Sequence, residues 1–140
     1  MTPERRCEAL GEAPEPLLER LADTILESAP VQVVAGPEVA SAAVRLPVPG
    51  TGSTFVVGHV VVTTCQVELE GTRGDGMVQG RALRAALAAA ICDAEAERGG
   101  PMTEAVEALV EDVERDRGER LAEEARAVAA TRLDDGASAS

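Results

Sequence analysis

Several residue types are scarce in this sequence, and each scarcity excludes a kind of chemistry. Its 140 residues include no lysine, no tryptophan and no tyrosine, with one histidine and one phenylalanine. Without lysine the chain cannot form a lysine Schiff base or build a lysine-bearing phosphate loop. One histidine and three widely spaced cysteines lack the ligand spacing of a metal site or redox pair, so we expect no bound metal.

Charge and the lack of aromatic rings also limit the partners. The formal net charge is -12, and such a surface repels a phosphate backbone. One aromatic side chain offers no platform on which bases could stack. No apolar run approaches the roughly 20 residues of a membrane span, and the charged segment 1–10 is unlike a signal peptide. We expect a soluble cytoplasmic protein that binds neither nucleic acid nor membrane.

The first half of the chain alternates between helical and strand periodicity. Leucine and isoleucine recur at three- and four-residue spacing over 17–26, which predicts an amphipathic helix. A short strand is predicted at 31–35, where Gly36 and Pro37 stop it. Two longer strands follow at 39–48 and 55–70, joined by a turn rich in glycine and proline. Pro47 indicates that the first of these two lies at a sheet edge.

The second half is mainly helical. Residues 71–76 are predicted to form a turn before a brief strand at 77–79. An alanine-rich helix then extends to Gly99, and a long acidic helix is expected over 103–132, with a bend near Gly118. The predicted class is α+β: a small, mostly antiparallel sheet with an N-terminal helix, an alanine-rich helix and the acidic helix. The last helix is too long for a compact domain, so part of it should protrude or lie on another chain, and we expect it to pack on a partner subunit.

A series of short motifs resembles the PhnG subunit of the carbon-phosphorus lyase system. The shared positions, in order along the chain, are Gly50-Thr51-Gly52, Phe55, Gly58, Thr63, Val67, Leu69, Gln79-Gly80-Arg81, Asp93-Ala94 and Ala130-Thr131-Arg132-Leu133-Asp134. The resemblance implies one PhnG-like domain over residues 1–134, followed by a disordered tail over 135–140.

The departures from this family fall on polar positions. An acidic residue of the family is His59 here, an arginine is Thr64, and a glutamate of the alanine-rich helix is Leu87. The sequence therefore resembles a divergent member.

The resemblance also implies an activity carried by an assembly. PhnG-like chains belong to a complex with PhnI, PhnH and PhnJ subunits. With PhnI, the implied reaction forms α-D-ribose 1-methylphosphonate 5-triphosphate from ATP and methylphosphonate and releases adenine. The ATP is bound as its Mg complex and is a substrate of the whole assembly. This chain would be an accessory subunit of that transferase, inactive alone and without a cofactor of its own. The alternative is a non-catalytic interaction module derived from the same family.

Two segments are candidates for binding an anion. The turn Gly50-Thr51-Gly52-Ser53 could present backbone N–H groups and two hydroxyls to a phosphate, although a plain hairpin turn is the favoured interpretation. Gln79, Gly80 and Arg81 precede the alanine-rich helix, where a guanidinium and free N–H groups could hold an anion together. A surface ion pair of Arg81 explains the same residues equally well.

Three further residues are weaker candidates, and no catalytic residue is identified. His59 shares a strand register with Val61 if no bulge intervenes, so we interpret it as a core histidine. Asp93 either pairs with Arg126 or Arg132, or contacts a partner. Arg132 is also a candidate through the family motif.

Overall fold

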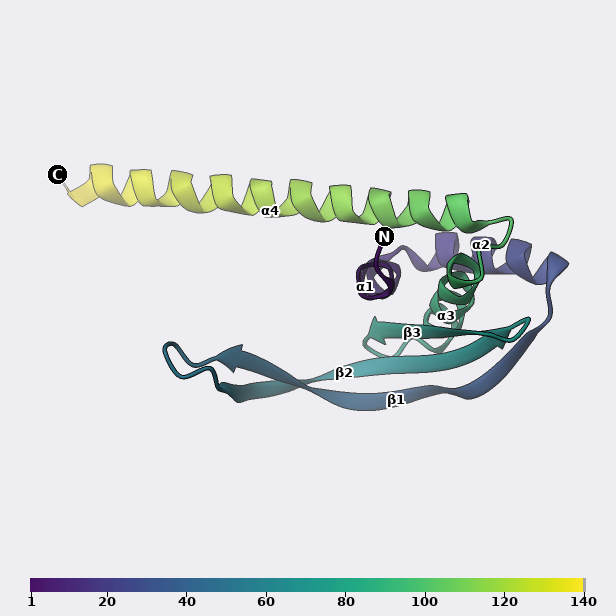
Figure 1. Ribbon diagram of the computed structural model, residues 1–140. Helices are drawn as coiled ribbons and strands as arrows, with labels where there is room; N and C mark the ends of the chain where they lie inside the picture. The colour runs from purple at the N-terminus through teal and green to yellow at the C-terminus, as the bar shows by residue number, and fades with distance from the viewer. Residues whose placement is uncertain (140) are drawn as a thin grey trace.

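The chain folds into a sheet with helices on one side, as a computed structural model shows (Figure 1). The structure describes the backbone of residues 1–139 and the side chains of residues 1–132. Over that range the elements in order are α1 (Pro3–Glu12), α2 (Glu15–Ser28), β1 (Val31–Pro47), β2 (Thr54–Leu69), β3 (Thr72–Gln79), α3 (Leu83–Glu97) and α4 (Thr103–Ala139). The predicted α+β class is confirmed.

The sheet is antiparallel in the order β1-β2-β3, and its strands differ greatly in length. β1 pairs with β2 from Val31↔Leu69 to Pro47↔Thr54, whereas β3 pairs with β2 only as far as Val62. The β1–β2 hairpin therefore continues beyond the end of β3. We call this projecting part, residues 41–61, the arm.

β1 is one strand, whereas the sequence predicted a stop at Gly36 and Pro37. Pairing with β2 resumes at Glu38↔Thr64 after register shifts, and Gly36 accommodates the irregularity at a φ of 79°. A side chain there would meet the Thr64 carbonyl oxygen at 2.6 Å. The long partner strand thus overrides the local turn signal, and Pro47 lies on an edge strand as predicted.

β3 is longer than the sequence predicted because its glycines serve packing rather than a turn. The turn is confined to Glu70 and Gly71, whose φ angles are 49° and 83°. Gly74 and Gly76 lie inside the strand, where an added Cβ would overlap the backbone of α3 at Ala90 and Ala86. The two glycines let the helix approach the sheet closely.

α3 is the central helix of the core. It packs against β2 and β3 on one side and against the other helices on the rest (Figure 1). Its buried residues are Ala85, Ala86, Ala88, Ala89, Ala90, Ile91, Cys92, Asp93, Ala94 and Glu95. Leu83, the first residue of the helix, is 51% exposed, although its spacing from Leu87 and Ile91 predicts that it shares their face.

α1 was not predicted as a helix. Thr2 caps it, because its Oγ1 accepts the Arg5 N–H at 3.2 Å, and Pro3 occupies the first turn. The helix buries Ala9 and Leu10, and it packs beside β3, α3 and α4. Gly11 faces the Met77 carbonyl so closely that a Cβ would overlap it.

α4 is a single straight helix through Gly118, without the predicted bend (Figure 1). Its 37 residues span about 55 Å at 1.5 Å per residue. Val106, Val110 and Val113 are buried, whereas Leu121 is 58% exposed. We call residues 118–132 the α4 extension. The predicted disordered tail, residues 135–140, lies beyond the described side chains and stays a prediction.

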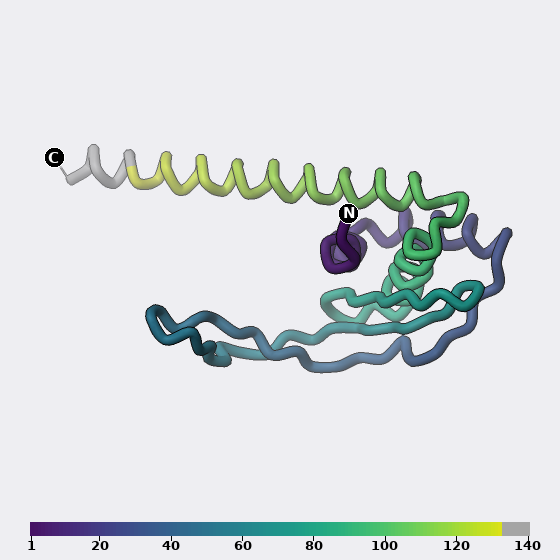
Figure 2. Tube along the Cα trace, viewed as in Figure 1, coloured from purple at the N-terminus to yellow at the C-terminus, as the bar shows by residue number. Residues whose placement is uncertain are grey.

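The arm and the α4 extension project from the same side of the molecule. Figure 2 shows both segments running past α1 in the same direction. No helix within the described residues is long and apolar enough to cross a membrane.

Candidate functional site

A buried ion pair fixes α1 to α3 and β3. Arg6 Nε donates to Asp93 Oδ1 at 2.7 Å, and Arg6 Nη2 donates to Glu97 Oε2 at 2.6 Å. The second oxygen of Asp93 accepts the Asp75 N–H of β3 at 2.9 Å. Both side chains of the Arg6–Asp93 pair are less than 10% exposed, at 7% and 9%. Asp93 therefore pairs with Arg6, and the predicted pairing with Arg126 or Arg132 is wrong.

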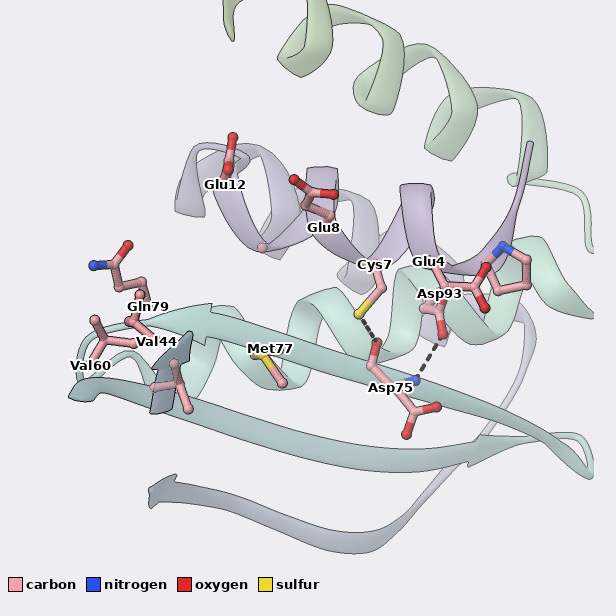
Figure 3. Close-up of a pocket in the computed structure, with 13 residues that line it drawn as sticks. Glu4, Cys7, Glu8, Glu12, Val44, Val60, Asp75, Met77, Gln79 and Asp93 are labelled. Atoms are coloured by element: carbon pink, nitrogen blue, oxygen red, sulfur yellow. Dashed lines mark hydrogen bonds between the residues drawn. The ribbon is translucent and has the colours of Figure 1, made fainter. Parts of the chain in front are cut away.

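α1 also covers the outer edge of β3. The Cys7 thiol donates to the Asp75 carbonyl at 3.7 Å, and the backbone N–H of Asp75 donates to the Asp93 carboxylate. Both backbone groups of Asp75 that point away from β2 are thus satisfied within the chain (Figure 3). A sheet edge covered in this way is closed to another strand.

Beside this contact lies a groove between α1 and the strands, which we call the α1 groove (Figure 3). Its volume is about 720 Å³. The lining residues are Pro3, Glu4, Cys7, Glu8, Gly11 and Glu12 of α1, Val44, Val60 and Val62 of the hairpin, Asp75, Met77 and Gln79 of β3, and Asp93 of α3.

The groove is negatively charged along α1. Glu4, Glu8 and Glu12 lie four residues apart and so share one face of the helix. Arg117 of α4 approaches two of them, at 3.6 Å from Glu8 and 2.8 Å from Glu12. The carboxylate of Glu4 lies at the other end of the row, on the side of Asp93 (Figure 3).

The thiols are poor nucleophiles. Burial raises the pKa of the Cys7 thiol, and the nearby Asp93 and Asp75 carboxylates add to this effect. Burial also raises the pKa of Cys65. Burial and the neighbouring Glu95 raise the pKa of Cys92 to about 12. A thiol with a raised pKa carries little thiolate at neutral pH. The described residues also contain no group of three or more His, Cys, Asp or Glu side chains that could hold a metal ion.

The first anion-binding candidate lies at the tip of the arm. Gly50 and Gly52 have φ angles of 78° and 72°, and the turn bonds to itself. The Thr51 hydroxyl donates to the Val48 carbonyl at 3.0 Å and accepts the Ser53 N–H at 3.2 Å. These contacts are those of a hairpin turn, and they occupy the hydroxyl that an anion would need.

The second candidate segment connects β3 to α3. The Thr63 hydroxyl donates to the Gly80 carbonyl at 2.6 Å and accepts the Ala82 N–H at 3.0 Å, which fixes this connection. Arg81 is exposed, and Gln79 lines the α1 groove. The eight residues of β2 between the level of Gln79 and Thr54 correspond to about 26 Å, so the fold does not bring the two candidates together.

His59 and Arg132 are both exposed. The prediction that His59 lies in the core is wrong for two reasons. Val57 is a bulge without a partner between the pairs Val44↔Gly58 and Arg45↔Val56, so the alternation changes there. The register of His59 is shared with Val61, but α3 does not reach this part of the strand, and Val61 is itself 44% exposed.

The sequence did not single out Arg6, Cys7 or the glutamates of α1. A signal was present, because Thr2 and Pro3 form a helix start and glutamate recurs every fourth residue after it. The groove itself combines side chains from α1, β1, β2, β3 and α3, and only the tertiary structure brings these together.

Taken together, the fold is that of a small α+β protein whose exposed apolar projections suit a subunit of a larger assembly. A family model described as "Phosphonate metabolism protein PhnG" matches residues 2–135. The chain belongs to the PhnG family and so has a role in phosphonate metabolism. No curated protein matches the sequence.

Proposed function

We propose that this chain is an accessory subunit of a carbon-phosphorus lyase complex. With a PhnI-like subunit, it would support the formation of α-D-ribose 1-methylphosphonate 5-triphosphate from ATP and methylphosphonate, with release of adenine. PhnH-like and PhnJ-like subunits would complete the complex. Membership of the PhnG family supports the pathway, and the structure of the arm supports the role as a subunit.

The arm is the observation that carries the role as a subunit. Its exposed apolar side chains, each between 37% and 49% accessible, are Val44, Leu46, Phe55, Val56, Val57 and Val61. Because consecutive strand residues point to opposite faces, the run 55–57 places apolar side chains on both faces. Exposed apolar surface of this kind is typical of a protein interface.

The charge pattern leads to the same conclusion. No acidic residue occurs from Val39 to Val67, although the whole chain has 25 of them, and Arg45 is the one arginine in that segment. A strand pair with a single charged side chain and two apolar faces loses little on desolvation and gains from burial. Burial of the arm by a partner would therefore stabilise the complex between the two chains.

The proposal is tested by co-expressing the chain with a PhnI-like subunit. We expect a stable complex that releases adenine from ATP in the presence of methylphosphonate, measured by chromatography, with the phosphonate ester followed by phosphorus NMR. The double variant Phe55→Ser, Val57→Ser should fold normally and lose the complex. The matched variant Leu17→Ser, Leu83→Ser removes apolar side chains of the body that are 44% and 51% exposed, and it should bind as the unaltered chain does. Failure of the unaltered chain to bind, or a complex without adenine release, would refute the proposal.

A second candidate is a non-catalytic interaction module derived from the family. It is favoured by the positions of two departures, because His59 lies on the arm and Thr64 lies on the sheet near its base. Restoring the family residues with His59→Glu and Thr64→Arg tests it. If the restored chain supports adenine release and the natural one binds the partner without it, the second function holds.

A further inference from the structure

The floor of the α1 groove is apolar and is continuous with the arm. Val60 and Val62 of β2 form it together with Met77 of β3, and Val44 extends it onto the arm. Val62 is 7% exposed, whereas Met77 is 51% exposed, so the floor is well packed beneath and open above. Such a floor suits an apolar side chain of a partner.

The rim of the same groove is acidic. Glu4 and Glu8 follow one side along α1, and Asp75 of β3 also lines the groove. None of the described residues that line it is an arginine, although the chain has 13. Asp93, at the back, is already neutralised by its contact with Arg6 at 2.7 Å. Glu8 and Asp75 have only long contacts with arginines on the exposed surface, at 3.6 Å from Arg117 and 3.9 Å from Arg73. The charge that remains for a partner is therefore mainly on Glu4, with a part on Glu8 and Asp75.

We propose that the α1 groove receives a segment of the partner subunit in which basic side chains alternate with apolar ones. The apolar side chains would lie on Val60, Val62 and Met77, and the arginines or lysines would reach the carboxylates of the rim. This inference rests on the proposed function, because the segment belongs to the subunit that encloses the arm. The groove begins where the arm leaves the body, so one partner can cover both.

Other occupants fit the groove less well. A second copy of this chain carries the same net charge of -12, and several of its arginines are already engaged, such as Arg5 with Glu114 and Arg98 with Glu95. A small inorganic cation would leave the apolar floor exposed to water. Cationic and apolar groups on one segment satisfy the rim and the floor together.

The test compares two double charge reversals with the same change in net charge. Glu4→Arg, Glu8→Arg alters the rim, and the control Asp23→Arg, Glu27→Arg places the same four-residue spacing on exposed residues of α2. We expect the first variant to bind the PhnI-like subunit at least about tenfold more weakly at low salt, with the difference shrinking as salt rises. The control should bind as the unaltered chain does.

A milder variant guards against misfolding. Glu4→Gln, Glu8→Gln removes the charges without placing an arginine beside Arg117, and its matched control is Asp23→Gln, Glu27→Gln. Equal binding by the rim variants and their controls overturns the inference while leaving the proposed function standing. No binding by the unaltered chain overturns both.

Thiol labelling gives a second readout that does not depend on the charge variants. Cys7 lines the groove and is partly exposed, whereas Cys65 and Cys92 are buried and serve as internal references. Alkylation of Cys7 should be slower in the complex with the PhnI-like subunit than in the free chain. In a separate variant, Met77→Gln should weaken binding because it replaces an apolar side chain of the floor. Unchanged labelling of Cys7 in a stable complex contradicts occupancy of the groove.

Discussion

Both halves of the β1–β2 hairpin are rich in valine, but their surroundings are opposite. In the half beneath α3, Val67 and Leu69 are 0% exposed, whereas in the arm Phe55 and Val57 are 48% and 49% exposed. The difference lies in the neighbours, because β3 and α3 end at the level where the arm begins. The same strand, β2, therefore contributes buried side chains to the core in one half and exposed apolar side chains in the other.

The edges of the hairpin differ in the same way. β1 carries Pro37, Glu38 and Pro47 on its outer edge, all of which discourage pairing with another strand. β2 in the arm has neither proline nor charge from Thr54 to Gly58, although its bulge at Val57 interrupts the ladder. The protection of one edge and not the other indicates which side of the arm a partner approaches.

The largest effect we expect is on the buried ion pair of the body. Asp93→Ala leaves the Arg6 guanidinium buried with only Glu97 beside it, and should lower the free energy of unfolding by about 3–5 kcal/mol. Urea denaturation measures this. Asp112→Ala breaks the pair between Asp112 and Arg115, whose side chains are 63% and 62% exposed, and should cost less than about 1 kcal/mol. Similar losses in both variants would mean that the Arg6–Asp93 contact is not buried in solution.

A matched pair of leucines tests the two halves of the hairpin directly. Leu69→Ala should cost about 2–5 kcal/mol, because its side chain is fully buried and a cavity remains. Leu46→Ala in the arm should change the stability of the free chain by no more than about 0.5 kcal/mol, since the side chain is 48% exposed. Chemical denaturation of both variants is the measurement. A large loss with Leu46→Ala would mean that the arm is already covered, by a second copy for example.

Two strand glycines give a smaller contrast. Gly76→Ala should cost about 1–3 kcal/mol, because the new Cβ overlaps the backbone of α3 at Ala86. Gly58→Ala in the arm meets nothing within 4 Å and should be neutral or slightly stabilising. Thermal unfolding separates the two outcomes. Equal stability of both variants would show that α3 does not lie against Gly76.

Much of this fold follows from local patterns in the sequence, and the errors have physical causes. The amphipathic spacing of Leu18, Leu21 and Ile25 predicts α2, and the β-branched run predicts β2. The glycines at 74 and 76 were assigned to a turn because close approach of a helix and a positive φ both favour glycine. Only the packed structure distinguishes the two causes.

The candidate site was less predictable than the fold. The alternation of apolar residues indicates the face on which His59 lies, but not how far α3 extends over that face. α1 was missed because its buried side includes a charged residue, Arg6, whose partner Asp93 is 87 residues away in sequence. A periodicity based on hydrophobicity cannot detect a helix that is held by an ion pair.

The smallest expected effect concerns the contact between Arg5 and Glu114, which lies in the packed part of α4 shortly before the extension begins. The hydrogen bond from Arg5 to Glu114, followed by the charges of Arg5 and Arg117, lowers the pKa of the Glu114 carboxyl from 4.5. A carboxyl with a lowered pKa in the folded chain stabilises it above the unfolded value, and this contribution is lost as the pH falls below 4.5. Because the pair is exposed, the effect should be small and should weaken with salt.

Glu114→Gln should therefore lower the thermal midpoint slightly at neutral pH and converge with the unaltered chain in acid. The Arg5–Glu114 contact also holds α1 against α4. Hydrogen exchange of the α1 amides should therefore be faster in the variant at neutral pH and equal to that of the unaltered chain in acid. Glu124→Gln, on the α4 extension, is the control, since its side chain is exposed and forms no ion pair among the described residues. If Glu124→Gln and Glu114→Gln altered the pH profile equally, α4 would be held to the body along its whole length, and the extension would not be free for a partner.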